Sequence, residues 1–227
     1  MTNSVKHSLP YISVGQSQKE VTHNEALAIL DILLAGVCSS IETGPPATSD
    51  GLVVLVAASS TTGAFVGKEN KIAYYLTSAA AWAYSTPVTG QTINVTSTNT
   101  TYRYSGSAWV AQSGTYTPTL TNVTNINAST AYPVQWMRVG NVVNLSGKAR
   151  FNATAAGAAE LGISLPPAAT SNFANNYEAA GTASSDNVLD GPMWIEADVT
   201  NDRLSLKSTQ NGTTNHDHFF HATYQVN

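Results

Sequence analysis

The stretch VQWMRVGNVVNLSGKARF, residues 134–151, contains the pattern that decides the fold. Gly140 and Asn141 separate two runs of mixed apolar and polar residues, and this dipeptide favours a two-residue hairpin turn. After the turn, every second residue is apolar or small: Val143, Leu145, Gly147, Ala149 and Phe151. The residues between them are polar or charged: Asn144, Ser146, Lys148 and Arg150. The alternation predicts an antiparallel strand with one face in a core and the other in solvent.

Further strands are predicted on both sides of this hairpin. Thr115–Thr121 is predicted as one strand, and LGISLP, YEAAGTAS, MWIEADV, RLSLKS and HFFHATYQV follow the hairpin as others. Thr200, Asn201 and Asp202 are turn-forming residues between MWIEADV and RLSLKS. About eight short strands without a helix predict a jelly-roll-like antiparallel β-sandwich over residues 113–227.

The first part of the chain contains one predicted helix. Thr22 and Glu25 match a capping box, in which each side chain bonds the other residue's backbone amide. Ser17 and Glu20 repeat the same pattern one turn earlier, so both starting points stay open. Gly36 or the later Gly-Pro-Pro run at residues 44–46 is expected to end the helix.

From residue 51 the hydrophobic period changes from helical spacing to alternation. LVVLVAA and KIAYYL read as strands, and Trp82 and Trp109 each follow a Tyr and a small-residue turn, which hints at a duplicated hairpin. The predicted fold class is therefore mainly β. Residues 1–44 are predicted as an arm with an oligomerisation and attachment helix, 45–112 as a small β domain with Trp hairpins, and 113–227 as the sandwich.

Composition excludes several classes of function. Ten Lys and Arg against fourteen Asp and Glu give a net charge of −4, which leaves no basic field for nucleic acid or an anionic membrane. Cys38 is the only cysteine, so an internal disulfide and a Cys-based zinc site are excluded. No run approaches the length of a membrane span, and the start of the chain lacks the apolar core of a signal peptide.

Two segments carry a resemblance. LPYISVGQSQKEVTHNEALAILD, residues 9–31, resembles the opening signature of a domain family found in phage and gene-transfer-agent spike and fibre proteins, and the likeness extends to about residue 112. GTYTPTLTNVTN, the hairpin at 134–151, LGISLP and the terminal TYQV are similar to a β-sandwich at the C-terminus of phage fibre and receptor-binding proteins. The resemblance implies a structural virion protein and supplies no catalytic motif.

The helical region supplies the candidate oligomerisation and attachment residues. An apolar stripe on a short helix needs a partner surface, and a bundle around an axis provides one. His23 and Glu25 do not form a catalytic pair, because residues two apart on a helix point to different faces. The candidates are Thr22, His23, Asn24, Glu25, Leu27, Leu30 and Leu34.

Candidate glycan-binding residues lie near loops of the second domain. Tyr177, Asp190 and Trp194 combine aromatic faces with a hydrogen-bonding group, which suits sugar rings and hydroxyls. The other aromatic candidates are expected to be core residues: Trp82, Tyr84, Tyr104, Trp109 and Trp136.

Two more specific chemical interpretations, a metal site and a glycosidase pair, have less support from the sequence. His216 and His218 lie on one face of a strand and could bind a metal on the axis of a trimer, although one chain offers too few ligands. Glu196 and Asp198 share a strand face at a spacing that overlaps that of an inverting glycosidase. No metal, cofactor or enzymatic activity is expected.

The sequence thus favours a short tail fibre or head spike of a bacteriophage or phage-like particle. We expect a homotrimer, assembled in the bacterial cytoplasm, that joins other virion proteins through its N-terminus and binds host-surface polysaccharide through its C-terminal sandwich. The alternatives are a polysaccharide-degrading depolymerase and a free carbohydrate-binding module. Whether such a fibre stands on a head or a tail is left open.

Overall fold

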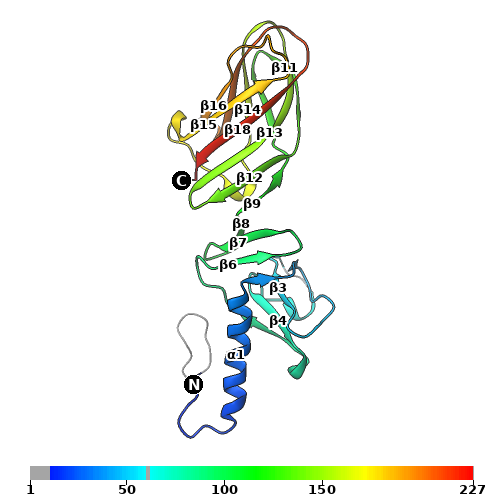
Figure 1. Ribbon diagram of the computed structural model, residues 1–227, viewed down its shortest axis with the longest axis vertical. Helices are drawn as coiled ribbons and strands as arrows, with labels where there is room; N and C mark the ends of the chain where they lie inside the picture. Colours follow the sequence, from blue (N-terminus) through cyan, green and yellow to red (C-terminus); the bar gives the residue numbers. More distant parts are fainter. Residues whose placement is uncertain (1–10, 60–61, 227) are drawn as a thin grey trace. The chain divides into compact units, whose positions relative to one another are not determined.

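The computed structural model describes residues 11–59 and 62–226 (Figure 1). By internal contacts the chain divides into two compact units, the first ending at Ala111 and the second beginning at Gln112. The predicted start of the sandwich at residue 113 lies next to this boundary. The expected N-terminal arm falls largely on residues 1–10, which lie outside the described residues.

Helix α1 (Lys19–Ala35) begins differently from a capping-box helix. Its N-cap is Gln18 in a left-handed conformation, without a side-chain cap hydrogen bond. The earlier predicted start is off by one residue, because the cap is Gln18 and not Ser17. The later start is wrong, because Thr22 lies inside the helix, where it is buried and accepts a hydrogen bond from the Gln16 side-chain amide. The helix ends as predicted at Gly36, whose φ of 61° suits a residue without a Cβ.

Two small sheets follow the helix, and they share one topology. In each, a two-residue strand pairs parallel with the first strand of a three-stranded antiparallel meander. One sheet contains β2 (Ile41–Glu42), β3 (Val53–Val56), β4 (Ile72–Leu76) and β5 (Ala81–Ser85). The other contains β1 (Val37–Cys38), β6 (Thr92–Val95), β7 (Thr100–Tyr104) and β8 (Trp109–Ala111). Trp82 and Trp109 lie on the last strand of their sheets, in keeping with the hint of duplication.

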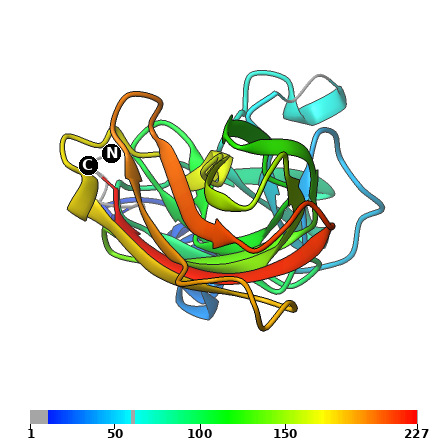
Figure 2. The same cartoon turned by 90° about the horizontal axis from the view of Figure 1, so that it is seen from above.

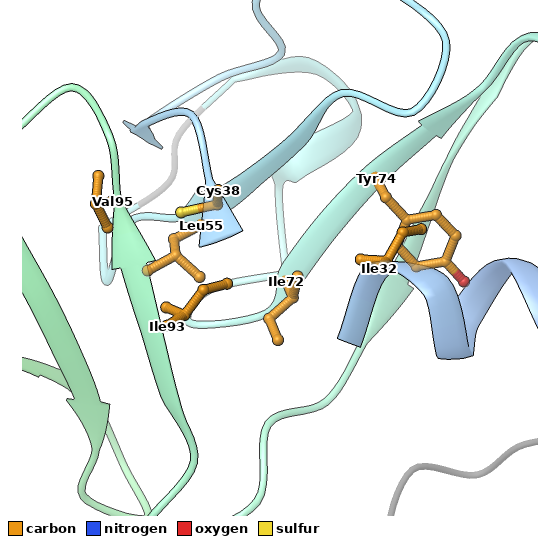
Figure 3. Packing of buried hydrophobic residues seen from close by; sticks show 7 residues of the cluster. All are labelled: Ile32, Cys38, Leu55, Ile72, Tyr74, Ile93 and Val95. Atoms are coloured by element: carbon orange, nitrogen blue, oxygen red, sulfur yellow. The ribbon is translucent and has the colours of Figure 1, made fainter. Parts of the chain in front are cut away.

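The helix and both small sheets share a hydrophobic core (Figure 3). Its buried members are Ile32 of α1, Cys38, Leu55, Ile72, Tyr74, Ile93 and Val95. The predicted boundary at residue 44 therefore does not divide two compact units. The helix before it buries its inner face against strands that follow it in the chain. Burial also raises the pKa of the Cys38 thiol to about 11, which leaves it protonated and unreactive.

The described residues of the second unit form one antiparallel sheet of ten strands. Strands β9 to β14 are Ser113–Tyr116, Leu120–Thr124, Ile126–Ala131, Val134–Val139, Val142–Ala153 and Gly157–Ile163. Strands β15 to β18 are Ala179–Ser185, Trp194–Asp198, Arg203–Gln210 and His216–Gln225. The hydrogen-bonded order is β10-β14-β17-β16-β15-β18-β13-β12-β9, and β11 pairs with the far part of β13.

The predicted strand Thr115–Thr121 is wrong, because it is two strands. Pro118 lies between β9 and β10, and a proline cannot donate to a strand ladder. These strands are consecutive in the chain, yet they lie at opposite ends of the sheet order. The sheet must therefore curl until its two edges approach (Figure 2). The Tyr116 hydroxyl donates to the Ser164 carbonyl across this gap at 2.8 Å, and the Thr119 amide donates to the Ser164 hydroxyl at 2.9 Å.

The predicted hairpin at residues 134–151 is confirmed in detail. Val139 pairs with Val142, so Gly140 and Asn141 form the two-residue turn. Val143, Leu145 and Phe151 are buried in the interior of the curled sheet, together with Leu161, Leu204, Leu206, Phe220 and Tyr224. The mainly β class is confirmed, with an N-terminal helix, small sheets and a large antiparallel sheet. In the described part of the chain, no helix is both long and apolar enough to cross a membrane.

Candidate functional site

The solvent-facing side of the large sheet carries a row of aligned side chains. Cross-strand register pairs Gln135 with Ser146, Ser146 with His221, His221 with Thr182, and Thr182 with Trp194. Paired residues of neighbouring strands point to the same face, so the five side chains follow one another across β12, β13, β18, β15 and β16. Their immediate neighbours along the strands, such as Leu145 and Ala222, are buried on the inner face. We call this surface the outer face.

A groove of about 510 Å³ occupies one end of the outer face. Its lining comes from β9, β12, β13 and β18 and includes Thr115, Gln135, Met137, Asn144, Ser146 and His221. The Thr223 hydroxyl donates to Asn144 Oδ1 at 2.6 Å, which fixes the orientation of that amide. The groove thus combines amide, hydroxyl and imidazole groups with three apolar side chains, of which Met137 is 52% exposed and Trp136 and Leu145 are buried.

Trp194 lies beyond the groove on the same row and is 45% exposed. Its indole N–H donates to Glu196 Oε2 at 3.3 Å, and Glu196 Oε1 accepts a hydrogen bond from Lys207 Nζ at 2.5 Å. The Lys207 ammonium lowers the pKa of Glu196, and the carboxylate in turn raises the pKa of Lys207. Glu196 lies two residues after Trp194 on β16, and Lys207 lies opposite Trp194 on β17. Their hydrogen bonds therefore hold the indole ring in a defined orientation.

The carboxylates proposed as a glycosidase pair are both occupied by cations. Glu196 binds Lys207, and Asp198 Oδ2 lies 2.7 Å from Arg203 Nε. Burial raises the pKa of Asp198, but the hydrogen bonds from Asn201 and Arg203 together lower it by more, so the pKa lies below its ordinary value. A glycosidase needs one carboxyl group that keeps its proton near neutral pH. Neither carboxylate meets that requirement.

The predicted glycan-binding residues have three different environments. Trp194 lies on the outer face, and Tyr177 is 76% exposed on the 3-10 turn η4 (Asn176–Glu178). The assignment of Asp190 is wrong, because its side chain is only 1% exposed. Asp190 Oδ1 accepts hydrogen bonds from the Asn187 side chain at 3.1 Å and the Asn211 amide at 3.0 Å. Asp190 therefore stabilises the loop between β15 and β16 through buried hydrogen bonds and does not present its carboxylate to a ligand.

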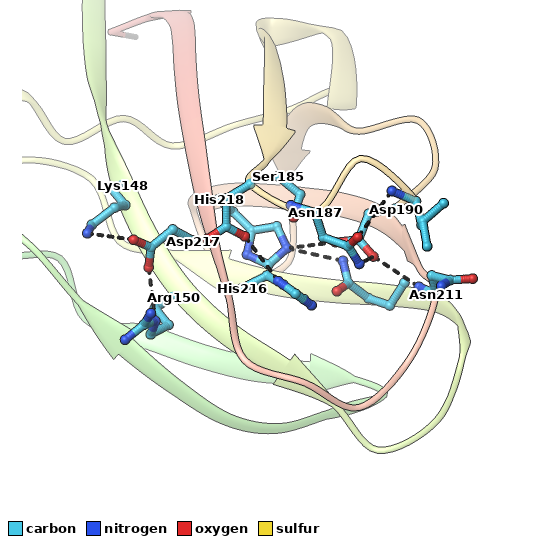
Figure 4. A network of polar contacts seen from close by, with 12 residues as sticks. Lys148, Arg150, Ser185, Asn187, Asp190, Asn211, His216, Asp217 and His218 are labelled. Carbon is cyan, nitrogen blue, oxygen red and sulfur yellow. Dashed lines mark hydrogen bonds and ion pairs between the residues drawn. The ribbon is translucent and has the colours of Figure 1, made fainter.

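The two histidines weighed as metal ligands have separate partners inside the sheet (Figure 4). The ring of His218 is fully buried and stacks on Phe151 with 3.7 Å between ring centroids. His216 Nδ1 lies 3.0 Å from Asp186 Oδ1. A buried His218 cannot reach a metal shared between copies of the chain. Among the described residues, no cluster of three or more His, Cys, Asp or Glu side chains could hold a metal ion.

Helix α1 presents a second exposed surface, the leucine stripe. Leu27, Leu30 and Leu34 are spaced three and four residues apart and are 48%, 37% and 82% exposed. Ile29, Ile32 and Leu33 point the other way, into the core with the small sheets. His23 and Asn24 are exposed, whereas the burial of Thr22 contradicts its predicted contact with a partner. The side chain of Glu25 lies outside the described part.

Sequence reasoning missed most of the groove. Alternation along β12 and β13 does place Gln135, Met137 and Ser146 on the solvent side. What the sequence does not carry is the pairing of β13 with β18, which brings His221 beside Ser146 from 75 residues further along the chain. The Trp194–Glu196–Lys207 contact likewise depends on the hairpin of β16 and β17.

Comparison with protein families finds one match. Residues 23–110 match the model of a family described as a protein of unknown function, DUF2793. This segment corresponds to most of the first unit and stops short of the large sheet. No curated protein matches the chain.

Proposed function

We propose that the protein is a structural component of a bacteriophage or phage-like particle, a short tail fibre or a head spike. Its N-terminal unit joins other virion proteins, and its C-terminal sheet binds polysaccharide on the host surface. The observation that carries the proposal is the neutral groove on the outer face, with a fixed and exposed indole in the same row. Hydroxyl-rich ligands suit amide, hydroxyl and imidazole groups, and sugar rings stack on aromatic faces.

The leucine stripe supports the assembly part of the proposal. Three large apolar side chains on one exposed helix face gain free energy when a second surface covers them. We assign that surface to the same helix in other copies, in a homotrimer assembled in the bacterial cytoplasm. The likeness of residues 16–27, QSQKEVTHNEAL, to phage spike and fibre proteins supports the same assignment.

The test combines location with binding. Antibodies against the chain should label particles at a fixed position in electron micrographs, and the purified protein should bind host cells in a saturable manner. Periodate treatment of the cells should abolish that binding, because periodate cleaves vicinal diols of sugars. Release of reducing ends from the host polysaccharide would instead identify a depolymerase. A monomer that binds sugar but is absent from particles would identify a free carbohydrate-binding module.

A further inference from the structure

The groove and Trp194 are close enough to serve one ligand. His221 lines the groove, and only Thr182 on β15 separates it from Trp194 in the register of the sheet. Neighbouring strands are about 4.8 Å apart, so His221 and Trp194 lie roughly 10 Å from each other along the row. From Thr115 to Trp194 the row covers about 24 Å, which is five strand spacings. That length exceeds a monosaccharide and matches an oligosaccharide segment.

The indole is prepared for stacking before any ligand arrives. Its N–H is held by Glu196, and Glu196 is held by Lys207, so the ring keeps one orientation while 45% of the residue stays exposed. A side chain that is already ordered loses little conformational entropy on binding. The exposed hydroxyl-bearing Thr182 lies between this ring and the groove.

The lysines and the arginine near the row are each bound to a carboxylate of the same face. Lys207 binds Glu196, while Lys148 and Arg150 both bind Asp217 at 2.9 and 3.0 Å (Figure 4). Apart from the imidazole of His221, the groove is lined by uncharged residues. An acidic sugar would therefore find no lysine or arginine in the groove to offset the cost of removing its charge from water. A neutral sugar carries no charge and does not incur that cost.

We propose that the groove and Trp194 are successive subsites for one neutral oligosaccharide segment that crosses the strands of the outer face. Amide, hydroxyl and imidazole groups of the groove bind hydroxyls of the first sugars, Met137 covers an apolar ring face, and Trp194 stacks on a sugar further along. This inference rests on the proposed function and deepens it, because it states which class of glycan binds and how long the bound segment is.

The experiment uses the full chain. Neutral and acidic bacterial polysaccharides are screened on an array, and the neutral polysaccharide that binds is cut into an oligosaccharide ladder for calorimetry. Affinity should rise with length and level off once a segment reaches Trp194. Trp194→Ala should weaken binding of the long oligosaccharides about tenfold and leave the shortest unchanged. Gln135→Ala should weaken both, Trp194→Phe should retain most of the affinity, and Val188→Ala, at a residue 92% exposed in the loop before β16, is the control off the row.

Each contrary result overturns a different statement. A length-independent affinity, or Trp194→Ala and Val188→Ala acting alike, would remove the second subsite and leave glycan binding standing. Preference for acidic polysaccharides would overturn the neutral class. Loss of the oligomer in Gln135→Ala, seen by light scattering, would identify the outer face as a contact between copies. Failure of all polysaccharides to bind would contradict the proposed function itself. Thermal unfolding of every variant separates these results from misfolding.

Discussion

At the scale of single residues, His218 is the most unusual buried group. It lies beside Asp190, with 3.9 Å between His218 Nε2 and Asp190 Oδ2, and Gln210 Nε2 is 3.2 Å from the same ring nitrogen. Burial lowers its pKa from 6.5 to about 4, although the Asp190 carboxylate opposes the shift. The neutral ring that results can stack on Phe151 without a charge in the core.

This shift predicts an acid-sensitive second unit. The folded-state pKa lies below the unfolded one, so the unfolded chain binds the proton more tightly and stability is lost as pH falls from 6.5 toward 4. Between pH 7.5 and pH 5 the free energy of unfolding should drop by about 2 kcal/mol on this account. Urea unfolding at both pH values measures the drop. His218→Gln should abolish most of it, and an equal drop in the variant would contradict the assignment.

Gly181 predicts a second residue-scale effect, since it faces backbone at close range. A Cβ there would lie 2.3 Å from the His221 carbonyl oxygen and 2.8 Å from Ala222 Cα. Gly181→Ala should therefore cost about 1–3 kcal/mol, because two paired strands must move apart. Gly212→Ala is the control, since its Cβ would meet nothing within 4 Å. Chemical denaturation of both variants is the measurement, and equal stability would contradict the close packing.

At the scale of elements, local signals predicted what depends on local contacts. The Gly140–Asn141 turn and the alternation after it define the β12–β13 hairpin without help from the rest of the chain. Strand β11 was missed because only Ile126 in INASTA is a large apolar residue, and three of its six residues are exposed while none is buried. The curl was missed because it follows from the pairing of distant strands. The groove was missed for the same reason.

The leucine stripe predicts that helix α1 controls assembly. Replacing Leu27, Leu30 and Leu34 together by Gln should convert an oligomer to a monomer in light scattering at micromolar concentration. Helix content and thermal stability should change little, because these side chains are exposed. Ile32→Ala is the contrasting variant: it leaves a cavity in the core and should lower the free energy of unfolding by about 2 kcal/mol or more. A wild-type chain that is already monomeric would refute the trimer.

At the scale of the whole molecule, the two candidate surfaces belong to different units. The leucine stripe is on the unit that ends at Ala111, and the groove is on the unit that begins at Gln112. The second unit has its own sheet, hairpins and buried residues, which is what an independently folding domain requires. Assembly and glycan binding should therefore be separable by truncation.

Residues 112–227 alone should fold and unfold cooperatively, since the core of the large sheet is drawn from its own strands. One neutral groove gives weak affinity, whereas three grooves on one particle bind the same cell surface together. Fusing residues 112–227 to an unrelated trimeric coiled coil should therefore raise the apparent affinity for host cells roughly a hundredfold or more over the monomeric piece. Flow cytometry with both labelled proteins measures the difference, and the Trp194→Ala trimer is the control. If residues 112–227 fail to bind even as a trimer while residues 1–111 bind, the host-facing end of the molecule is the N-terminal unit.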